Sequence, residues 1–170
     1  MEEMKVCVKV GTHYKVECFG ADGLLKWIEE FDNIVVTAGL NKLLDATLKT
    51  GLASPLWYVG LVNNAGWTAY AAGDIMSSHT GWAEGTPYSN ATRPAFTPGT
   101  ISAGSVDNSA SKAVFNINAT LTVRGCFMAD ENTKGGTTGT LYGEGDFTAA
   151  RSVLSGDTLN VTVTATAAAA

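Results

Sequence analysis

Two stretches in the last third of the sequence alternate apolar with polar residues, and this period of two limits the fold more than any other feature. Residues 114–123 carry Phe, Ile, Ala, Leu and Val at every second position, with Asn and Thr between them. Residues 159–166 repeat the pattern with Leu, Val, Val and Ala opposed to Asn and Thr. Because successive side chains of a β-strand point to opposite faces of a sheet, both stretches are predicted to be strands with one buried face.

The first 36 residues predict a meander of three short strands. Residues 5–10 place valines on one face of the first strand. Residues 14–18 continue the apolar alternation after Gly11-Thr12, which we expect to turn the chain. A Gly-Ala-Asp-Gly turn signal then precedes a third strand over residues 24–31.

The next segment changes from a strand period to a helix period. Leu40, Leu43, Leu44 and Leu48 follow one another at i, i+3, i+4 and i+8, which places them on one face of a helix. Thr37 is the expected N-cap and Gly51 the expected residue after the C-cap. The spacing predicts an amphipathic helix over about 38–50, with the leucine stripe in the core.

The short apolar run at residues 56–62 is typical of a buried strand. A long segment without a periodic pattern follows it. From about 63 to 100, small and polar residues dominate, and so long a loop region in a compact domain is commonly functional. Its aromatic residues are Trp67, Tyr70, Trp82, Tyr88 and Phe96. Because Trp and Tyr anchor interfaces, we predict these residues as partner contacts; the alternative is that the tryptophans close the end of a sandwich.

These patterns together predict a mainly β chain with a single domain over residues 1–170. The expected architecture is a β-sandwich of antiparallel strands, with strands over 1–36, one helix within 37–50, a strand at 56–62, the loop region, and further strands over 101–166. We expect the Ala167–Ala170 tail to fray.

The charge of the chain argues against several classes of partner. Only 16% of the residues are charged, the net charge is −5, and the lysines and arginines are dispersed along the chain. A nucleic-acid interface needs a concentrated basic face, and an anionic membrane surface needs a basic cluster, so neither partner is expected. The acidic start lacks the apolar core of a signal peptide, which predicts a soluble protein made in a cytoplasm.

The sequence contains no convincing catalytic constellation. The nucleophile elbow G-x-S-x-G is absent, and His79 is the one histidine with polar neighbours, namely Asp74 and Glu84. We expect His79 to be a loop residue packed on Trp82. Glu144 and Asp146 could share one face of a strand, but such a pair is more often surface charge or a weak calcium contact. No catalytic residue is predicted.

Metal and cofactor sites are not predicted either. Cys7, Cys18 and Cys126 show no CxxC spacing, and the histidines stand at no recognisable ligand spacing. The three cysteines are expected to be reduced and buried, acting as small hydrophobic residues. The glycine-rich segment 135–139 lacks the lysine and the helix of a phosphate-binding loop and is expected to be a hairpin turn.

Several turn-and-strand segments resemble a small family of tailed-phage virion proteins, and the similarity covers most of residues 33–165. The segments that carry it are Asn33–Asn41, Pro94–Ser102, Ser105–Phe115, Thr133–Gly143 and Val153–Val163. Such proteins resemble head decoration or cement subunits, or other components of the particle surface. The resemblance implies a virion protein assembled in the cytoplasm of a bacterial host.

Three functions are consistent with this reading. The first is a capsid decoration or cement subunit, a homo-oligomer that binds the major capsid protein and stabilises the head through subunit contacts. The second is a tail or fibre component that binds a host-surface glycan or an adjoining tail protein. The third, far behind, is a small cell-wall hydrolase that would depend on His79 or Glu144.

Overall fold

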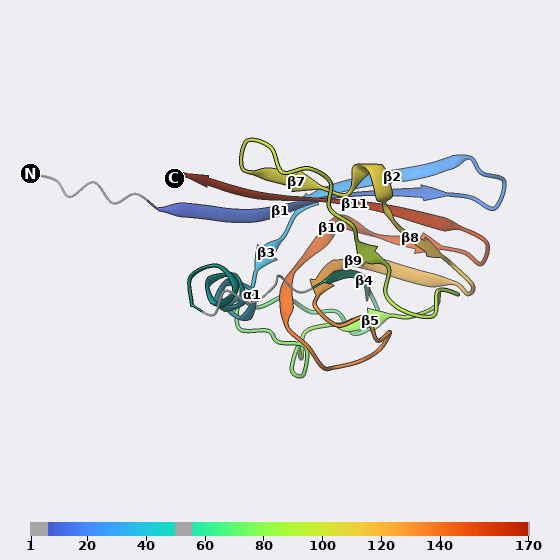
Figure 1. Ribbon diagram of the computed structural model, residues 1–170. Helices are drawn as coiled ribbons and strands as arrows, with labels where there is room; N and C mark the ends of the chain where they lie inside the picture. Colours follow the sequence, from blue (N-terminus) through green and yellow to red (C-terminus); the bar gives the residue numbers. More distant parts are fainter. Residues whose placement is uncertain (1–6, 50–55, 170) are drawn as a thin grey trace, which may run out of the picture.

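The computed structural model describes residues 7–49 and 56–169, and its strands form two antiparallel sheets that face each other (Figure 1). One sheet has the order β2 (Leu25–Asp32), β1 (Val8–Phe19) and β11 (Thr158–Ala169), with β7 (Ser105–Asp107) and β8 (Ala113–Asn116) on the far edge of β11. The other has the order β3 (Ile34–Val35), β10 (Leu141–Val153), β9 (Leu121–Ala129) and β4 (Trp57–Asn63), with β5 (Ala83–Gly85) and β6 (Ala95–Phe96) on β4. The predicted β-sandwich of antiparallel strands is confirmed, and so is the buried strand near 56–62.

The core lies between the two sheets and is built by the residues that alternate inward. Tyr14 of β1 is fully buried and stacks on Phe31 of β2, with ring centroids 5.1 Å apart. Phe147 of β10 meets Phe31 edge-on at 5.4 Å, so aromatic contacts join one sheet to the other. Edge-to-face pairs of this kind add to the free energy gained from burying the rings.

The first strand is continuous, which corrects the expected three-strand meander. Gly11 does not turn the chain; it pairs with Thr166 inside a ladder that runs from Val8 opposite Ala169 to Phe19 opposite Thr158. The long partner strand keeps β1 extended through its glycine. The predicted turn before β2 is present, with Gly23 at φ +76°. The same ladder holds Ala167–Ala169 in β11, so the expected fraying does not occur in this part of the tail.

The predicted strand over residues 114–123 is in fact two strands that belong to different sheets. β8 pairs with β11, whereas β9 pairs with β10 and β4. Residues 117–120 carry the chain across the sandwich between them. Phe115, Ile117 and Leu121 stay buried on both sides of this crossing because both sheets bury the same core.

The amphipathic helix is confirmed, but its orientation is not the expected one. It comprises α1 (Thr37–Leu44) and a π-helical turn, η1 (Asp45–Lys49). The N-cap is Val36, without a side-chain cap hydrogen bond, and Thr37 is the first helical residue. Gly51 lies outside the described residues.

The helix packs through its small side and leaves most of the leucine stripe in solvent. A Cβ atom on Gly39 would lie 2.2 Å from the carbonyl oxygen of Tyr142, so Gly39 permits a close approach to β10. Leu43 packs against the core. The exposed fractions of the other three leucines are 39% at Leu40, 56% at Leu44 and 80% at Leu48. The expectation that the stripe lies in the core is therefore wrong for these three residues.

The loop region folds back over the outer face of the β10–β9–β4 sheet, where the loop between β9 and β10 joins it (Figure 1). It builds a second apolar cluster with Trp82 and Met76 against Phe127 of β9 and Val62 of β4. A single 3-10 turn, η2 (Ser109–Ser111), separates β7 from β8. Among the helices of residues 7–49 and 56–169, none combines the length and the apolar character that crossing a membrane requires.

Candidate functional site

The five aromatic residues of the loop region do not gather on one surface. Tyr88 and Phe96 belong to the core between the sheets, and Trp82 belongs to the outer cluster. All three are buried, while Trp67 and Tyr70 are half-buried at the edge of the outer cluster. Partner contact through this set stays a prediction, and Trp67 and Tyr70 are its members with exposed ring area.

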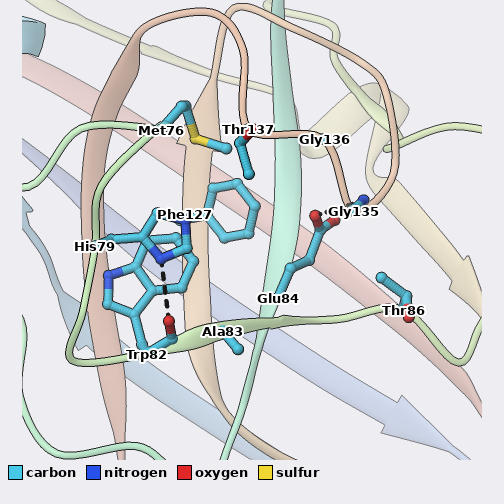
Figure 2. Close-up of a pocket in the computed structure, with 10 residues that line it drawn as sticks. All are labelled: Met76, His79, Trp82, Ala83, Glu84, Thr86, Phe127, Gly135, Gly136 and Thr137. Carbon is cyan, nitrogen blue, oxygen red and sulfur yellow. Dashed lines mark hydrogen bonds between the residues drawn. The ribbon is translucent and has the colours of Figure 1, made fainter.

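A small cavity of about 290 Å³ opens between this loop region and the loop that joins β9 to β10 (Figure 2). Met76, Trp82 and Phe127 supply its apolar wall. Glu84 and the backbone at Gly135 and Gly136 supply polar groups. The cavity combines a hydrophobic surface with a carboxylate. Whether it could bind a ligand depends on whether its polar residues are already occupied by contacts within the protein.

His79 is stacked on Trp82, as the sequence predicts. The two ring centroids are 3.9 Å apart with 21° between the planes. Nδ1 of His79 lies 3.0 Å from the carbonyl oxygen of Trp82 (Figure 2). Because a carbonyl oxygen only accepts, Nδ1 carries the hydrogen in this pair. The histidine is thus held by the loop itself, and Asp74 instead accepts a hydrogen bond from Nε1 of Trp82 at 3.3 Å.

The carboxylate of Glu84 is used within the protein to hold Arg93. The Nε and Nη2 atoms of Arg93 donate to the two carboxylate oxygens at 3.1 and 2.8 Å. Glu84 also accepts from the backbone N–H of Gly135 and from the hydroxyl of Tyr88. The side chains of Glu84 and Arg93 are 8% and 0% exposed. All of these donors belong to the protein itself, so the carboxylate of Glu84 holds the loops around it together.

Arg93 ties the two loops together. Its Nη1 and Nη2 atoms donate to the carbonyl oxygens of Glu131 and Gly136, each at 2.8 Å. Its guanidinium carbon also lies 5.1 Å from the centroid of the Phe127 ring. The segment 135–139 lies in the loop that joins the paired antiparallel strands β9 and β10, so the expected hairpin connection is confirmed, and Arg93 anchors it. Local sequence gave no signal for this contact, because Arg93 and Gly136 are far apart in the chain.

Glu144 is a buried acid beside a second acid. Its side chain is fully buried on the outer face of β10 next to the carboxyl of Asp74, and no ion pair holds it among residues 7–49 and 56–169. Burial, followed by the neighbouring Asp74 carboxyl, raises the pKa of Glu144 to about 9. Glu144 is therefore protonated and neutral at neutral pH. Sequence reasoning grouped it with Asp146, but Asp146 instead forms an ion pair with Arg124.

The cysteines are all free, and two of the three are buried. Cys18 and Cys126 match the expectation of small buried hydrophobic residues, whereas Cys7 is exposed, against expectation. Within residues 7–49 and 56–169, no three His, Cys, Asp or Glu side chains come together in a way that could hold a metal ion.

Several exposed apolar side chains lie at the helix end of the sandwich. The exposed side chains of Leu40, Leu44 and Leu48 form what we call the leucine ridge. Close to it, an apolar groove of about 510 Å³, here the sheet-edge groove, runs between the sheets. Its lining includes Leu43, Trp57, Phe96, Ile101, Met128 and Tyr142.

Two further apolar side chains stand at the rim of the sheet-edge groove. Leu56 is 73% exposed and Ile101 is 75% exposed. Leu43 lines this groove and belongs to the same helix as the leucine ridge. We call the ridge, the groove and its two rim residues the apolar corner, and it is the candidate functional surface of this protein. The sequence contained the signal, namely the leucine stripe, but a stripe of this spacing is equally compatible with burial inside one chain and with burial between chains.

Comparison of the chain with known proteins gives no family assignment. No protein-family model matches the sequence, and no curated protein is significantly similar to it.

Proposed function

We propose that this protein is a structural subunit of a tailed-phage particle, a capsid decoration or cement protein that acts by packing against copies of itself and against the major capsid protein. The observation that carries the proposal is the apolar corner formed by the leucine ridge and the sheet-edge groove. Exposed apolar side chains that gather in one region of a soluble protein often mark an interaction site. A subunit that spends its functional life in a lattice keeps such a surface covered by its neighbours.

The charge distribution supports the same proposal. Charged residues make up 16% of the chain, against about 25% in an average protein. The outer face of β11 carries Thr158, Asn160, Thr162 and Thr164, which are polar and uncharged, although Glu17 and Lys15 of β1 lie directly opposite Asn160 and Thr162. Interfaces are depleted of charge in their centres and are often polar at their rims, so this face suits the rim of a protein contact.

The alternative, a tail or fibre component that binds a host glycan, receives less support from the aromatic residues. Sugar rings stack on exposed faces of tryptophan. One face of Trp82 is covered by His79, and the guanidinium of Arg124 lies 4.0 Å from the centroid of Trp67. These ring faces are used inside the chain, which favours assembly over glycan recognition.

Quantitative mass spectrometry of purified particles tests the proposal. The measurement compares the copy number of this chain with that of the major coat protein in particles of the phage that encodes it. A ratio near one, or a simple fraction of it, is expected for a decoration or cement subunit. A handful of copies would favour the tail or fibre, and absence from the particle would overturn the virion role.

A further inference from the structure

We propose that residues 68–81 form a flap that is kept closed by a proton held between Asp74 of the flap and Glu144 of β10. The flap lies on the outer face of the β10–β9–β4 sheet, over the second apolar cluster (Figure 1). Loss of the proton favours opening, which uncovers this cluster. The proposal is independent of the virion role, because it concerns contacts within one chain.

The two ends of the flap meet at its base. The backbone N–H and the hydroxyl of Thr68 both donate to the carbonyl oxygen of Gly81, at 2.7 and 3.3 Å. A Cβ atom on Gly81 would lie 2.0 Å from the carbonyl oxygen of Ala69, so the two ends also pack closely. Moving loops swing about a few residues at their ends, and a closed base lets this loop move as one body.

Beyond its base, the flap is held to the sheet and to the helix by neutral contacts. The hydroxyl of Tyr70 donates to the carbonyl oxygen of Gly145 at 3.2 Å. The backbone N–H of Thr37, at the start of α1, donates to the carbonyl oxygen of Ala72 at 2.9 Å. Met76 is buried in the outer cluster. None of these contacts requires a charge, so they hold the flap equally well at every pH near neutrality.

The remaining contact joins two acids. Glu144 and Asp74 are both buried, and Oδ2 of Asp74 accepts hydrogen bonds from the N–H of Ala71 at 3.2 Å and from Nε1 of Trp82 at 3.3 Å. Burial, followed by the hydrogen bond and the charge of Asp74, raises the pKa of Glu144 to about 9. If Glu144 ionised in place, two carboxylates would lie side by side in an apolar setting, which strongly disfavours the charged form.

The neighbouring groups do not neutralise a second carboxylate. The other titratable or charged side chains around the pair are Tyr70 and His79 of the flap, Arg124 and Cys126 of β9, Asp146 of β10 and Lys42 of α1. Burial raises the pKa of Tyr70 and of Cys126, so both stay neutral. Arg124 is paired with Asp146, and Lys42 is paired with Asp130 at 3.3 Å. His79 is stacked on Trp82 and bonded to its carbonyl oxygen.

The shared proton makes the closure of the flap depend on pH. Opening exposes Glu144 to water, where its pKa returns to the ordinary 4.5, so between pH 4.5 and about pH 9 opening releases a proton. The closed flap is therefore most stable below pH 4.5 and loses stability as the pH rises toward 9. Within this range the opening equilibrium increases about tenfold per pH unit.

Hydrogen exchange of the full-length protein, read by NMR at pH 7 and pH 8, tests the proposal. The reporter is the amide of Thr37, because its acceptor Ala72 leaves with the flap. After correction for the intrinsic exchange rate, its protection factor should fall about tenfold from pH 7 to pH 8. It should also stay below the protection factors of the β11 amides, which exchange when the whole fold opens.

Two variants separate the effect of the proton from that of the loop itself. Glu144→Gln removes the titrating group and should make the protection of Thr37 independent of pH. Asp74→Asn keeps an acceptor oxygen but removes the like charge, and should give a smaller change than wild type. The control is Glu30→Gln, at an exposed side chain, which should keep the wild-type change. A Thr37 amide as protected as those of β11, or a fall that persists in Glu144→Gln, would overturn the proposal.

Discussion

Replacing Glu144 by Gln isolates the contribution of one proton to the stability of the fold. Burial and the Asp74 carboxyl raise the pKa of Glu144 from an ordinary 4.5 to about 9. Between these two pH values the folded protein holds a proton that the unfolded chain has released. The stability associated with this site is therefore fully present below pH 4.5 and is lost as the pH rises toward 9.

The size of the effect follows from the shift. Each pH unit within this window lowers the free energy of unfolding by about 1.4 kcal/mol, which amounts to about 3–4 kcal/mol between pH 4.5 and pH 7. Gln has the shape of the protonated acid, carries no titrating group and can donate its amide hydrogen to Asp74. We expect Glu144→Gln to raise the free energy of unfolding by up to about 3–4 kcal/mol at pH 7 and by less than about 1 kcal/mol at pH 5.

Urea unfolding between pH 5 and pH 8, followed by tryptophan fluorescence, measures this difference. Burial raises the pKa of the neighbouring Tyr70 well above this range. Groups that both proteins share cancel when the two pH profiles are subtracted. The control is Glu30→Gln, which makes the same substitution at an exposed side chain and should shift the curve by less than about 0.5 kcal/mol at every pH. Parallel pH profiles for wild type and Glu144→Gln would refute the reasoning.

Three further changes probe other parts of the structure. Arg93→Ala should lower the free energy of unfolding by about 3–5 kcal/mol in urea titrations, since it leaves the carboxylate of Glu84 buried without its cation; a loss below about 1 kcal/mol would contradict the role of Arg93 as a tie between loops. Gly125→Ala should lower the free energy of unfolding by at least about 1–3 kcal/mol, because the added Cβ atom would lie 2.0 Å from a backbone carbonyl oxygen of β10. The control is Gly73→Ala, whose Cβ atom would meet no atom within 4 Å, and this variant should unfold like wild type. In the native protein, a thiol reagent should label Cys7 alone, because burial raises the pKa of the other two thiols; rapid labelling of a second cysteine before unfolding would contradict their burial.

The strands could be predicted from the sequence because each buries one face, but their assignment to sheets could not. The inward positions Phe115, Ile117, Leu121 and Val123 keep their alternation while the chain leaves one sheet and enters the other. An alternation with a period of two shows which side chains of a strand point into the core. It does not show to which sheet the strand belongs, because both sheets of a sandwich face the same core. The turn predicted at Gly11 was wrong for a different reason. A glycine followed by threonine is also compatible with the interior of a long paired strand.

The candidate surface was visible in the sequence, but its meaning was not. The leucine stripe predicted the helix, yet the period of the stripe does not say which neighbour covers it. The decisive residue is Gly39, whose missing side chain lets the helix approach Tyr142 on the opposite side. Contacts such as that of Arg93 with Gly136, or of Asp74 with Glu144, join residues distant in the chain and have no local pattern. The packing of His79 on Trp82, three positions away, was predictable for the opposite reason.

The place of β11 in its sheet has a consequence for synthesis. This strand is the common partner of β1, β7 and β8, and Thr166 bonds to Gly11 across 155 positions of the chain. Until the ribosome has synthesised β11, the edges of β1, β7 and β8 that pair with it remain unpaired. Contacts between such distant residues also make folding slow. The nascent protein is therefore exposed to chaperones and proteases until its last strand emerges, and a premature stop before β11 would leave a chain that cannot close this sheet.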